Sequence, residues 1–328
     1  MLLTINNLHT DFALDAGTIR AVRGLDLELP RGETLCLVGE SGCGKSIAAL
    51  SVLRLIPAPG KIVTGGITFQ SAAGAVDLAA LSENGRAMRA IRGKEIAMIF
   101  QEPTTSLSPV HSIGNQIEEV VRLHTPLRGK AAKARVLRVM ARVGIPDAAR
   151  RYAQFPHELS GGLRQRAMIA MALACDPVLL IADEPTTALD VTIQAQILAL
   201  LRDLQQESGM TILLITHDFG VVAEMARQVA VMYLGRIVEQ APVARIFAAP
   251  QHPYTRALLA AMPSRATRGA PLYTIPGSVP DPFTQLSGCP FHPRCDVCLP
   301  DRCTSGPPPA LVEVAEAHSV ACHLAECR

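Results

Sequence analysis

One stretch of eight residues has the spacing G-x-x-x-x-G-K-[ST], in which glycines precede a lysine and a hydroxyl. It consists of Gly39, Glu40, Ser41, Gly42, Cys43, Gly44, Lys45 and Ser46. Glycines allow a tight turn in which several backbone N–H groups point at one anion. A helix that begins near Lys45 would add the positive end of its dipole. We therefore expect Lys45 to reach the β- and γ-phosphates of a nucleoside triphosphate and Ser46 to bind Mg²⁺.

The segments beside this loop have the order that phosphate binding requires. Residues 34–38 are an apolar run that predicts a buried strand, and residues 47–56 predict an apolar helix. A Gly-rich turn without a ligand is the alternative interpretation. The order strand, loop, Lys-Ser and helix favours phosphate binding.

A pair of acids follows a second apolar run, residues 178–182. At the end of a strand, Asp183 would hold Mg²⁺ through water, and Glu184 would place a carboxylate beside the γ-phosphate. Two acids in this position could instead cap the next helix. The phosphate-binding loop in the same chain favours the catalytic interpretation.

A second anion-binding pattern lies between these two sites. Ser160, Gly161 and Gly162 open onto a predicted helix. One nucleotide does not need two such cradles in one chain. We therefore expect two chains to pair head to tail, each closing the other's nucleotide with this helix N-terminus.

The elements that must position these residues predict an α/β core. Residues 1–35 alternate apolar and polar positions, which predicts antiparallel strands. The runs 178–182 and 211–215 predict central parallel strands joined by a helix over 191–206. Further strands are predicted at 65–69 and 96–100, a helical insertion at 113–175, and a closing hairpin at 229–232 and 236–239.

Composition limits the class of protein. Of 328 residues, 49% are hydrophobic, and the net charge is +2 from 31 basic and 29 acidic residues. A sizeable core is therefore predicted, and no basic stripe suggests nucleic acid. No apolar run is long enough to span a membrane, and the N-terminus lacks the pattern of a secretory signal. We expect a cytoplasmic location.

Nine cysteines are unevenly distributed, and six of them lie after residue 288. In a reducing cytoplasm such a cluster indicates a metal centre before it indicates disulfides. Four thiolates suit either Zn²⁺ or an iron–sulfur cluster, and free thiols are the remaining alternative. The segment is rich in proline from Pro242 onward and poor in apolar periodicity, so we expect few regular elements and too weak a core to fold alone.

The chain resembles the nucleotide-binding subunits of ATP-binding-cassette (ABC) transporters over residues 1 to about 245. The ordered motifs that carry the resemblance are residues 39–46, Gln101, residues 159–163, residues 179–184, the loop Ala188-Leu189-Asp190, and His217. The resemblance implies a P-loop NTPase cassette with a RecA-like core, an antiparallel β subdomain and a helical subdomain at about 102–175.

Within that family, four segments are similar to the dipeptide/oligopeptide permease branch. They are residues 101–109, 183–192, 252–259 and 288–295. This branch implies a cassette domain at 1–245 and a small, irregular, Cys-rich domain at 246–328. It also implies an ATPase that powers import of dipeptides, oligopeptides or a related small solute such as nickel or a glycan fragment.

The resemblance also assigns roles and partners. Glu184 would polarise the attacking water, His217 would contact the γ-phosphate and hold Glu184, and Gln101 would help to organise Mg²⁺ beside Ser46 and Asp183. The partners implied are a second, related ATPase subunit, two transmembrane permease subunits and an extracytoplasmic binding protein. The location implied is the cytoplasmic side of the cell membrane. A soluble ABC ATPase in DNA repair or translation is the alternative, and a non-hydrolysing regulatory cassette is a third possibility.

Two departures from the family pattern concern nucleotide binding. The signature ends in Leu163 instead of Gln, which spares the Ser-Gly-Gly cradle and is similar to the hydrophobic residue of this branch. The family stacks adenine on an aromatic residue upstream of the phosphate loop, and Phe12 is the only aromatic before Lys45. Phe12 or the apolar Ile19 is expected to contact the base.

The branch also suggests which cysteines act together. Cys289, Cys295, Cys303 and Cys322 match its four cysteines, which implies a structural [4Fe-4S] cluster, with Zn²⁺ as the second choice. Cys298 departs from the pattern and is an alternative to Cys303. Cys327 is the least favoured ligand.

Overall fold

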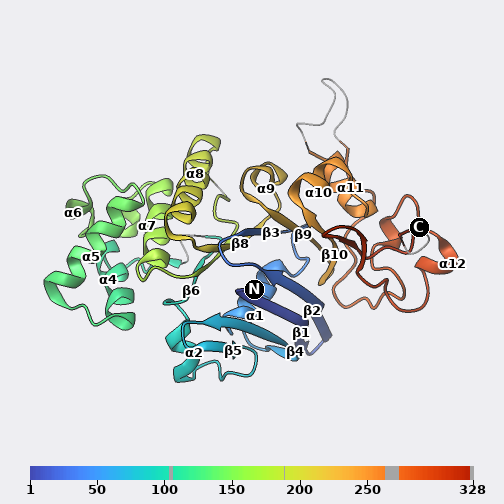
Figure 1. Ribbon diagram of the computed structural model, residues 1–328, viewed down its shortest axis with the longest axis horizontal. Helices are drawn as coiled ribbons and strands as arrows, with labels where there is room; N and C mark the ends of the chain where they lie inside the picture. Colours follow the sequence, from blue (N-terminus) through green and yellow to red (C-terminus); the bar gives the residue numbers. More distant parts are fainter. Residues whose placement is uncertain (103–105, 188, 263–272, 326–328) are drawn as a thin grey trace.

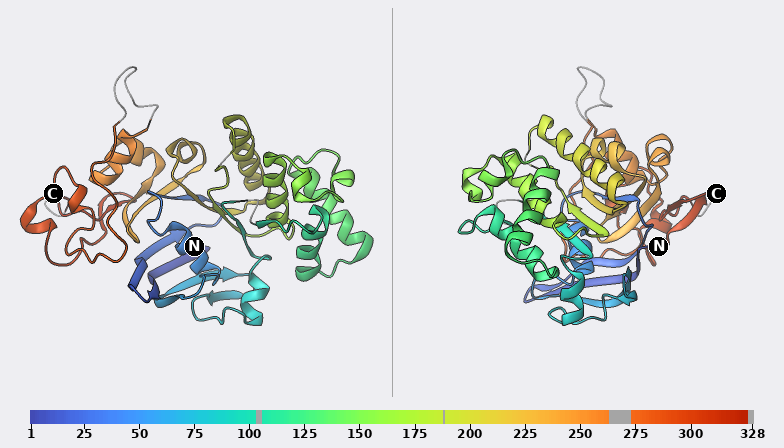
Figure 2. Two further views of the ribbon diagram at one scale, coloured as in Figure 1. Left: turned by 180° about the vertical axis from the view of Figure 1, so that it is seen from behind. Right: turned by 60° about the vertical axis from the view of Figure 1, so that its left-hand side comes forward.

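The computed structural model describes residues 1–102, 106–187, 189–262 and 273–325 (Figure 1). The predicted positions Ala188 and Cys327, and residues 103–105 of the segment 101–109, lie outside the described residues. A central sheet separates a helical region at one end of the molecule from the C-terminal extension at the other, and a smaller sheet lies alongside (Figures 1 and 2).

The smaller sheet has four antiparallel strands in the order β2-β1-β4-β5. They are β1 (Leu3–Leu14), β2 (Gly17–Leu29), β4 (Gly60–Ser71) and β5 (Gly74–Asp77), followed by helix α2 (Arg86–Ile91). The antiparallel strands predicted near the N-terminus are confirmed. Strand β4 is longer than the predicted 65–69 because its first half pairs with the end of β1, where Phe12 lies opposite Gly60.

The central sheet has the strand order β11-β12-β10-β9-β3-β8-β7-β6. Its main strands are β3 (Thr34–Val38), β6 (Ile96–Ile99), β7 (Leu179–Asp183), β8 (Thr211–Thr216), β9 (Gln228–Tyr233) and β10 (Arg236–Pro242). Every residue of β3, β7 and β8 is buried, and these strands pair in parallel. Buried parallel strands read as continuous apolar runs because both faces are covered, so the α/β prediction is confirmed. Their carboxyl ends meet at one edge, where the phosphate loop and Asp183 lie.

Helices cover this sheet and connect its strands. They are α1 (Lys45–Val52), α8 (Val191–Ser208), α9 (Phe219–Met225) and α10 (Val243–Ala248). The prediction that the first helix reaches residue 56 is wrong. Helix α1 ends at Val52 because Arg54 takes a positive φ of 53°, which an α-helix does not allow.

The predicted helical insertion is present between β6 and β7 and forms the end of the molecule opposite the C-terminal extension (Figure 1). It contains α4 (Ile113–His124), α5 (Gly129–Arg142), α6 (Ala148–Arg151), a 3₁₀ turn (Pro156–Glu158) and α7 (Gly161–Leu173). Ile113, Ile117 and Val121 are buried on one face of α4, as their spacing predicts. Within the described residues, no helix is long and apolar enough to cross a membrane.

The C-terminal extension is more regular than predicted. It contains α11 (Pro253–Ala260), a 3₁₀ turn (His292–Arg294), α12 (Pro300–Cys303), β11 (Val312–Ala315) and β12 (His318–Val320). Strand β12 pairs with β10, so the extension lengthens the central sheet. The carboxylate of Glu239, which is fully buried, accepts hydrogen bonds from the backbone N–H groups of Gln251 and His252 and contacts His318. Sequence periodicity missed this because the extension folds on the cassette surface instead of around its own core.

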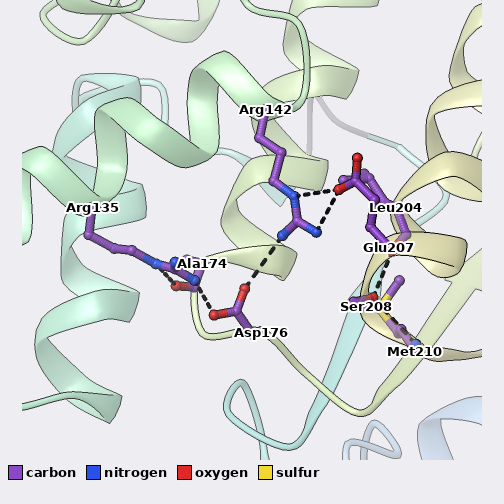
Figure 3. A network of polar contacts seen from close by, with 8 residues as sticks. All are labelled: Arg135, Arg142, Ala174, Asp176, Leu204, Glu207, Ser208 and Met210. Carbon is purple, nitrogen blue, oxygen red and sulfur yellow. Dashed lines mark hydrogen bonds and ion pairs between the residues drawn. The ribbon is translucent and has the colours of Figure 1, made fainter.

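A polar network joins the helical insertion to the rest of the cassette (Figure 3). Arg135 of α5 donates to the carbonyl oxygen of Ala174 at 3.0 Å and contacts Asp176 at 2.5 Å. Arg142 bridges Asp176 at 3.5 Å and Glu207 of α8 at 3.1 Å. Asp176 also has a positive φ of 50°, a conformation that Asp and Asn tolerate better than most residues.

We expect Asp176→Asn to lower the free energy of unfolding by less than about 1 kcal/mol, because the ion pairs are solvent-exposed. Asparagine keeps the tolerance for positive φ, so Asp176→Ala should cost more than Asp176→Asn. Urea unfolding of both variants measures the difference. Equal losses would show that charge alone matters at this position.

Candidate active site

The predicted phosphate loop connects β3 to α1, and backbone conformation explains its glycines. Gly44 caps α1 with a positive φ of 103°, and a Cβ there would lie 2.2 Å from the carbonyl oxygen of Ala21. Gly39 has a φ of 155°, and its Cβ would lie 2.2 Å from the carbonyl oxygen of Met232. Any side chain at either position would collide with backbone, so the loop needs glycine at both.

Lys45 lies inside this loop and is only 5% exposed. Its Nζ donates hydrogen bonds to the carbonyl oxygens of Gly39 at 2.7 Å and Glu40 at 2.9 Å. The two hydrogen bonds thus hold the ammonium group at the centre of the phosphate loop. A positive charge at this place, beside the N-terminus of α1, creates a site for an anion.

Asp183 ends β7 and is 5% exposed. Burial raises its pKa above the ordinary value, and a hydrogen bond with the Ser46 side chain opposes part of that rise. The Oδ1 atom is buried and has no hydrogen-bond partner among the described residues. An unsatisfied carboxylate oxygen next to a serine hydroxyl is a donor set that suits Mg²⁺, so the residues present fit this ion.

The next residue, Glu184, has an unusual backbone and a crowded carboxylate. Its φ is 47°, and its N–H donates to the carbonyl oxygen of Ile215 on β8 at 2.9 Å. The carboxylate accepts hydrogen bonds from Gln101 Nε2 at 3.2 Å and Thr187 Oγ1 at 2.8 Å, and it contacts His217 Nδ1 at 3.0 Å. Positive φ in a non-glycine residue is costly and typical of functional sites.

These contacts determine the charge of Glu184. Burial alone would raise the pKa of the carboxyl group, but the hydrogen bonds from His217 and Thr187 outweigh burial, and the pKa lies below its ordinary value. Glu184 is therefore ionised at neutral pH. An ionised carboxylate can accept a proton or polarise a water molecule.

A cavity of about 200 Å³ joins the two halves of the site. The predicted site residues that line it are Ser41, Gly42, Gly44, Lys45, Ser46, Gln101 and Glu184. Arg20, Arg23 and Pro282 also line it and were not predicted. Anion-binding groups thus share one cavity with the ionised acid, an arrangement suited to phosphoryl transfer to water.

Residues 22–187 match the protein family described as ABC transporter. The chain belongs to this family. It is an ABC ATPase, so ATP and Mg²⁺ are its cofactors, and the predicted cassette fold is confirmed. Residues 238–303 match a second family, described as the oligopeptide/dipeptide transporter C-terminal region.

Relatives match along almost the whole length of this ABC ATPase. A Brucella ovis protein named as a peptide import ATP-binding protein is 52% identical, over 98% of this chain and 96% of the relative. The dipeptide transport ATP-binding protein DppD of Bacillus subtilis is 46% identical, over 100% of this chain and 96% of the relative.

Solved ABC cassettes share the fold. A dimeric cassette, MJ0796, bound to ADP and phosphate, aligns with a TM-score of 0.65 and 25% identity, over 74% of this chain and 98% of that one. The protein cbiO1 of Clostridium perfringens aligns with a TM-score of 0.61 and 27% identity, over 76% of this chain and 91% of that one.

The predicted signature of the ABC ATPase is not part of its own nucleotide cavity. Ser160 is the N-cap of α7, and Gly161 and Gly162 begin that helix in the helical insertion. A Cβ on Gly161 would meet nothing within 4 Å, so this end of the helix is open. Its second turn is connected to the acidic strand end, because Gln165 Nε2 donates to the carbonyl oxygen of Pro185 at 2.5 Å.

The two residues expected to contact adenine lie in different surroundings. Ile19 lines the cavity beside the phosphate loop. The ring of Phe12 packs over Gly60, where an added Cβ would lie 2.4 Å from a ring carbon. Between the two, this geometry favours Ile19 as the apolar surface for the base. Phe283 of the C-terminal extension, which was not predicted, reaches the first residue of β2, where it would lie 3.3 Å from a Cβ on Gly17.

The predicted cysteines lie near one another in the C-terminal extension. Cys289, Cys295, Cys303 and Cys322 line one small cavity with His252, whose buried Nε2 has no hydrogen-bond partner among the described residues. Burial raises the pKa of Cys289 to about 12 and that of Cys295 to about 11, so these thiols are protonated at neutral pH. Sulfur and imidazole nitrogen are donor types that a soft metal binds, once the thiols have lost their protons.

The arrangement of these cysteines in the structure does not suit a metal ion. Within the described residues, no group of three or more His, Cys, Asp or Glu side chains is arranged to hold a metal ion. The cavity is about 10 Å³, roughly the room that one water molecule needs. A cavity of this size does not hold a four-iron cluster.

Proposed function

We propose that this chain is the ATP-hydrolysing subunit of an importer of dipeptides or oligopeptides. The match of residues 238–303 to the oligopeptide/dipeptide transporter C-terminal region carries this proposal, because the ABC cassette alone serves many functions. The names of the relatives from Brucella ovis and Bacillus subtilis support it. A related small solute such as nickel or a glycan fragment is the nearest alternative cargo.

In the proposed reaction, Lys45 and the N–H groups of the loop hold the phosphates. Glu184 polarises the attacking water, and His217 and Thr187 keep its carboxylate ionised and correctly oriented. Mg²⁺, when bound, offsets charge on the phosphates, and Ser46, Asp183 and Gln101 are the residues that would hold it. The contacts of Glu184 with Gln101, Thr187 and His217 support these roles.

We propose that two cassettes close on ATP head to tail, each using Ser160, Gly161 and Gly162 toward the partner's nucleotide. The exposed position of this helix end, away from its own cavity, supports this arrangement. The relative MJ0796 was solved as a dimer with ADP and phosphate. Asp190, which caps α8 through a hydrogen bond from the N–H of Ile193, would also face the partner.

The partner is proposed to be a second, related ATPase subunit, and the pair would bind two transmembrane permease subunits. Mass measurement of the complex purified from its own host tests this. One copy of this chain with one related ATPase is the expected result. Two copies of this chain without a second ATPase would contradict the heterodimer.

We propose that the chain is a peripheral subunit on the cytoplasmic side of the cell membrane, served by an extracytoplasmic binding protein. Gln101 would link the site to the membrane subunits, because it contacts Glu184 and begins the segment 101–109 that resembles the permease-contacting loop of the branch. When hydrolysis removes the γ-phosphate, Gln101 would lose its contact with it, and the segment 101–109 would pass the resulting movement to the membrane subunits.

Reconstitution of the four-subunit complex in vesicles tests the function. With ATP inside and the binding protein outside, uptake of a labelled dipeptide is expected, and the Glu184→Gln complex should take up none. Co-purification with nucleic acid, without hydrophobic subunits, would instead support a soluble ATPase in DNA repair or translation, which the comparisons do not favour.

We also propose the division into a cassette at 1–245 and a C-terminal domain at 246–328. The family matches at 22–187 and 238–303 support two units. Because β12 pairs with β10, the second unit depends on the first for part of its sheet.

The C-terminal cysteines are proposed to bind a [4Fe-4S] cluster, with Cys298 as an alternative ligand and Zn²⁺ as the second choice. Protein purified without oxygen is expected to be brown and to contain about four irons per chain. Colourless protein with one zinc per chain would favour the second choice, and metal-free, folded protein would contradict both. No step of the ATPase reaction depends on this site.

A further inference from the structure

The C-terminal extension reaches the phosphate loop through one residue, Glu40. Arg294 Nη1 donates to Glu40 Oε2 at 2.6 Å, and Nη2 donates to Oε1 at 2.9 Å. The two residues are 254 positions apart in the sequence. The Arg294 side chain is 4% exposed and that of Glu40 is 26% exposed, so this is a partly buried, two-pronged ion pair, a strong form of such a contact.

A second residue of the extension holds the backbone of the same loop position. The N–H of Glu40 donates to Tyr254 Oη at 2.9 Å. Tyr254 is fully buried, and its ring packs 4.7 Å from Tyr233 and 5.3 Å from Phe291, measured between ring centroids. Both the side chain and the peptide of Glu40 are therefore held by residues of the C-terminal extension.

These contacts continue to the residue that binds phosphate. The carbonyl oxygen of Glu40 accepts a hydrogen bond from Lys45 Nζ at 2.9 Å. Arg294 is itself anchored, because its Nε donates to the carbonyl oxygen of Pro276 at 3.1 Å and its N–H to that of Phe291 at 3.0 Å. A continuous chain of hydrogen bonds thus runs from the extension through Glu40 to Lys45.

We propose that Arg294 and Tyr254 are positioning residues that hold the phosphate loop in its nucleotide-binding conformation, so that the C-terminal extension sets the affinity for ATP. The proposal rests on the proposed ATPase function. A loop that is already ordered loses less conformational freedom on binding, and this raises affinity without any contact to the ligand. Linkage requires the converse effect, so bound nucleotide must stabilise the extension.

A double-mutant cycle on the full-length chain tests the proposal, with Mg-ATP binding measured by calorimetry. Arg294→Met should weaken binding roughly tenfold, and Glu40→Gln should weaken it as well, because each breaks the partly buried ion pair. The double variant should bind no more weakly than Arg294→Met, since neither partner then remains charged. Arg294→Lys keeps the charge but loses the fork, and it should be intermediate.

Tyr254→Phe removes one hydroxyl and should weaken binding by a few fold. It also keeps the test valid if Arg294→Met does not fold. KM for ATP should rise in these variants more than kcat falls. Lower thermal stability with an unchanged affinity for Mg-ATP in Arg294→Lys and Tyr254→Phe, or additive losses in the cycle, would overturn the proposal.

Hydrogen exchange distinguishes coupling from a purely structural role, because a purely structural contact would not make exchange in the extension depend on Mg-ATP. Mg-ATP should slow the exchange of backbone amides at residues 289–295 in the unaltered chain and leave it unchanged in Arg294→Met. Equal protection in both proteins would contradict the coupling. If the unaltered chain itself does not bind Mg-ATP, the proposed function is wrong. If every variant binds Mg-ATP normally, only the proposed coupling between the C-terminal extension and ATP binding is wrong.

Discussion

Glu184→Gln is expected to bind Mg-ATP as tightly as the unaltered chain and to hydrolyse it roughly 10²- to 10⁴-fold more slowly. The contacts that bind phosphate come from the loop and Lys45, which this change leaves intact. What is lost is the negative charge that His217 and Thr187 hold in the ionised state, and a neutral amide cannot polarise water in the same way. Interactions used only in the transition state affect rate and not binding.

Phosphate release in steady state measures the rate, and calorimetry measures the affinity. Because ATP then remains intact, the variant should also accumulate as a closed dimer with its ATPase partner in size-exclusion chromatography with Mg-ATP. Glu119→Gln, on an exposed position of α4, is the matched control and should hydrolyse ATP at the normal rate. Hydrolysis at the unmutated rate by Glu184→Gln would end the assignment of this residue.

Lys45→Ala is expected to abolish nucleotide binding, with an affinity at least about 100-fold lower, which is roughly 3 kcal/mol. The change removes a buried positive charge that is preorganised for the phosphates. It also leaves the carbonyl oxygens of Gly39 and Glu40 without the hydrogen bonds that Lys45 donates. Loss of binding, unlike loss of turnover, reflects contacts that already exist in the ground state.

Calorimetric titration with Mg-ATP provides the measurement, and circular dichroism establishes that the variant is folded. Lys61→Ala removes a lysine from an exposed position of β4 and should bind normally. A folded Lys45→Ala protein that binds Mg-ATP with unchanged affinity would refute the role of Lys45. Together the two variants separate binding from chemistry, since only Glu184→Gln should retain the nucleotide.

Local sequence predicted the parts of the site that a few neighbouring residues can build. The loop from Gly39 to Ser46 follows a buried strand and opens a helix, and its conformation depends on glycines where a Cβ would strike backbone. Asp183 ends an apolar run, and this run forms a central strand because both faces of the strand are buried. Such features depend on backbone geometry and short spacing, which the sequence displays directly.

Contacts between distant segments were harder to predict. The resemblance named Gln101, Glu184 and His217 as a group, and the structure brings all three together, while their catalytic roles stay predictions until variants are measured. Thr187 was missed, although a hydroxyl three residues after an acid can reach it. The end of α1 was misplaced because no local pattern announces the positive φ of Arg54.

By itself, the sequence determined that this chain is an α/β ATPase with a phosphate loop, an acidic strand end and a cysteine-rich C-terminal segment. Only the tertiary structure showed how that segment contacts the cassette. It adds β12 to the central sheet and forms an ion pair between the buried Arg294 and the partly exposed Glu40. No spacing rule links residues 254 positions apart. Their meeting depends on packing across the whole molecule, and the burial of Arg294 there makes its charge costly to leave unpaired.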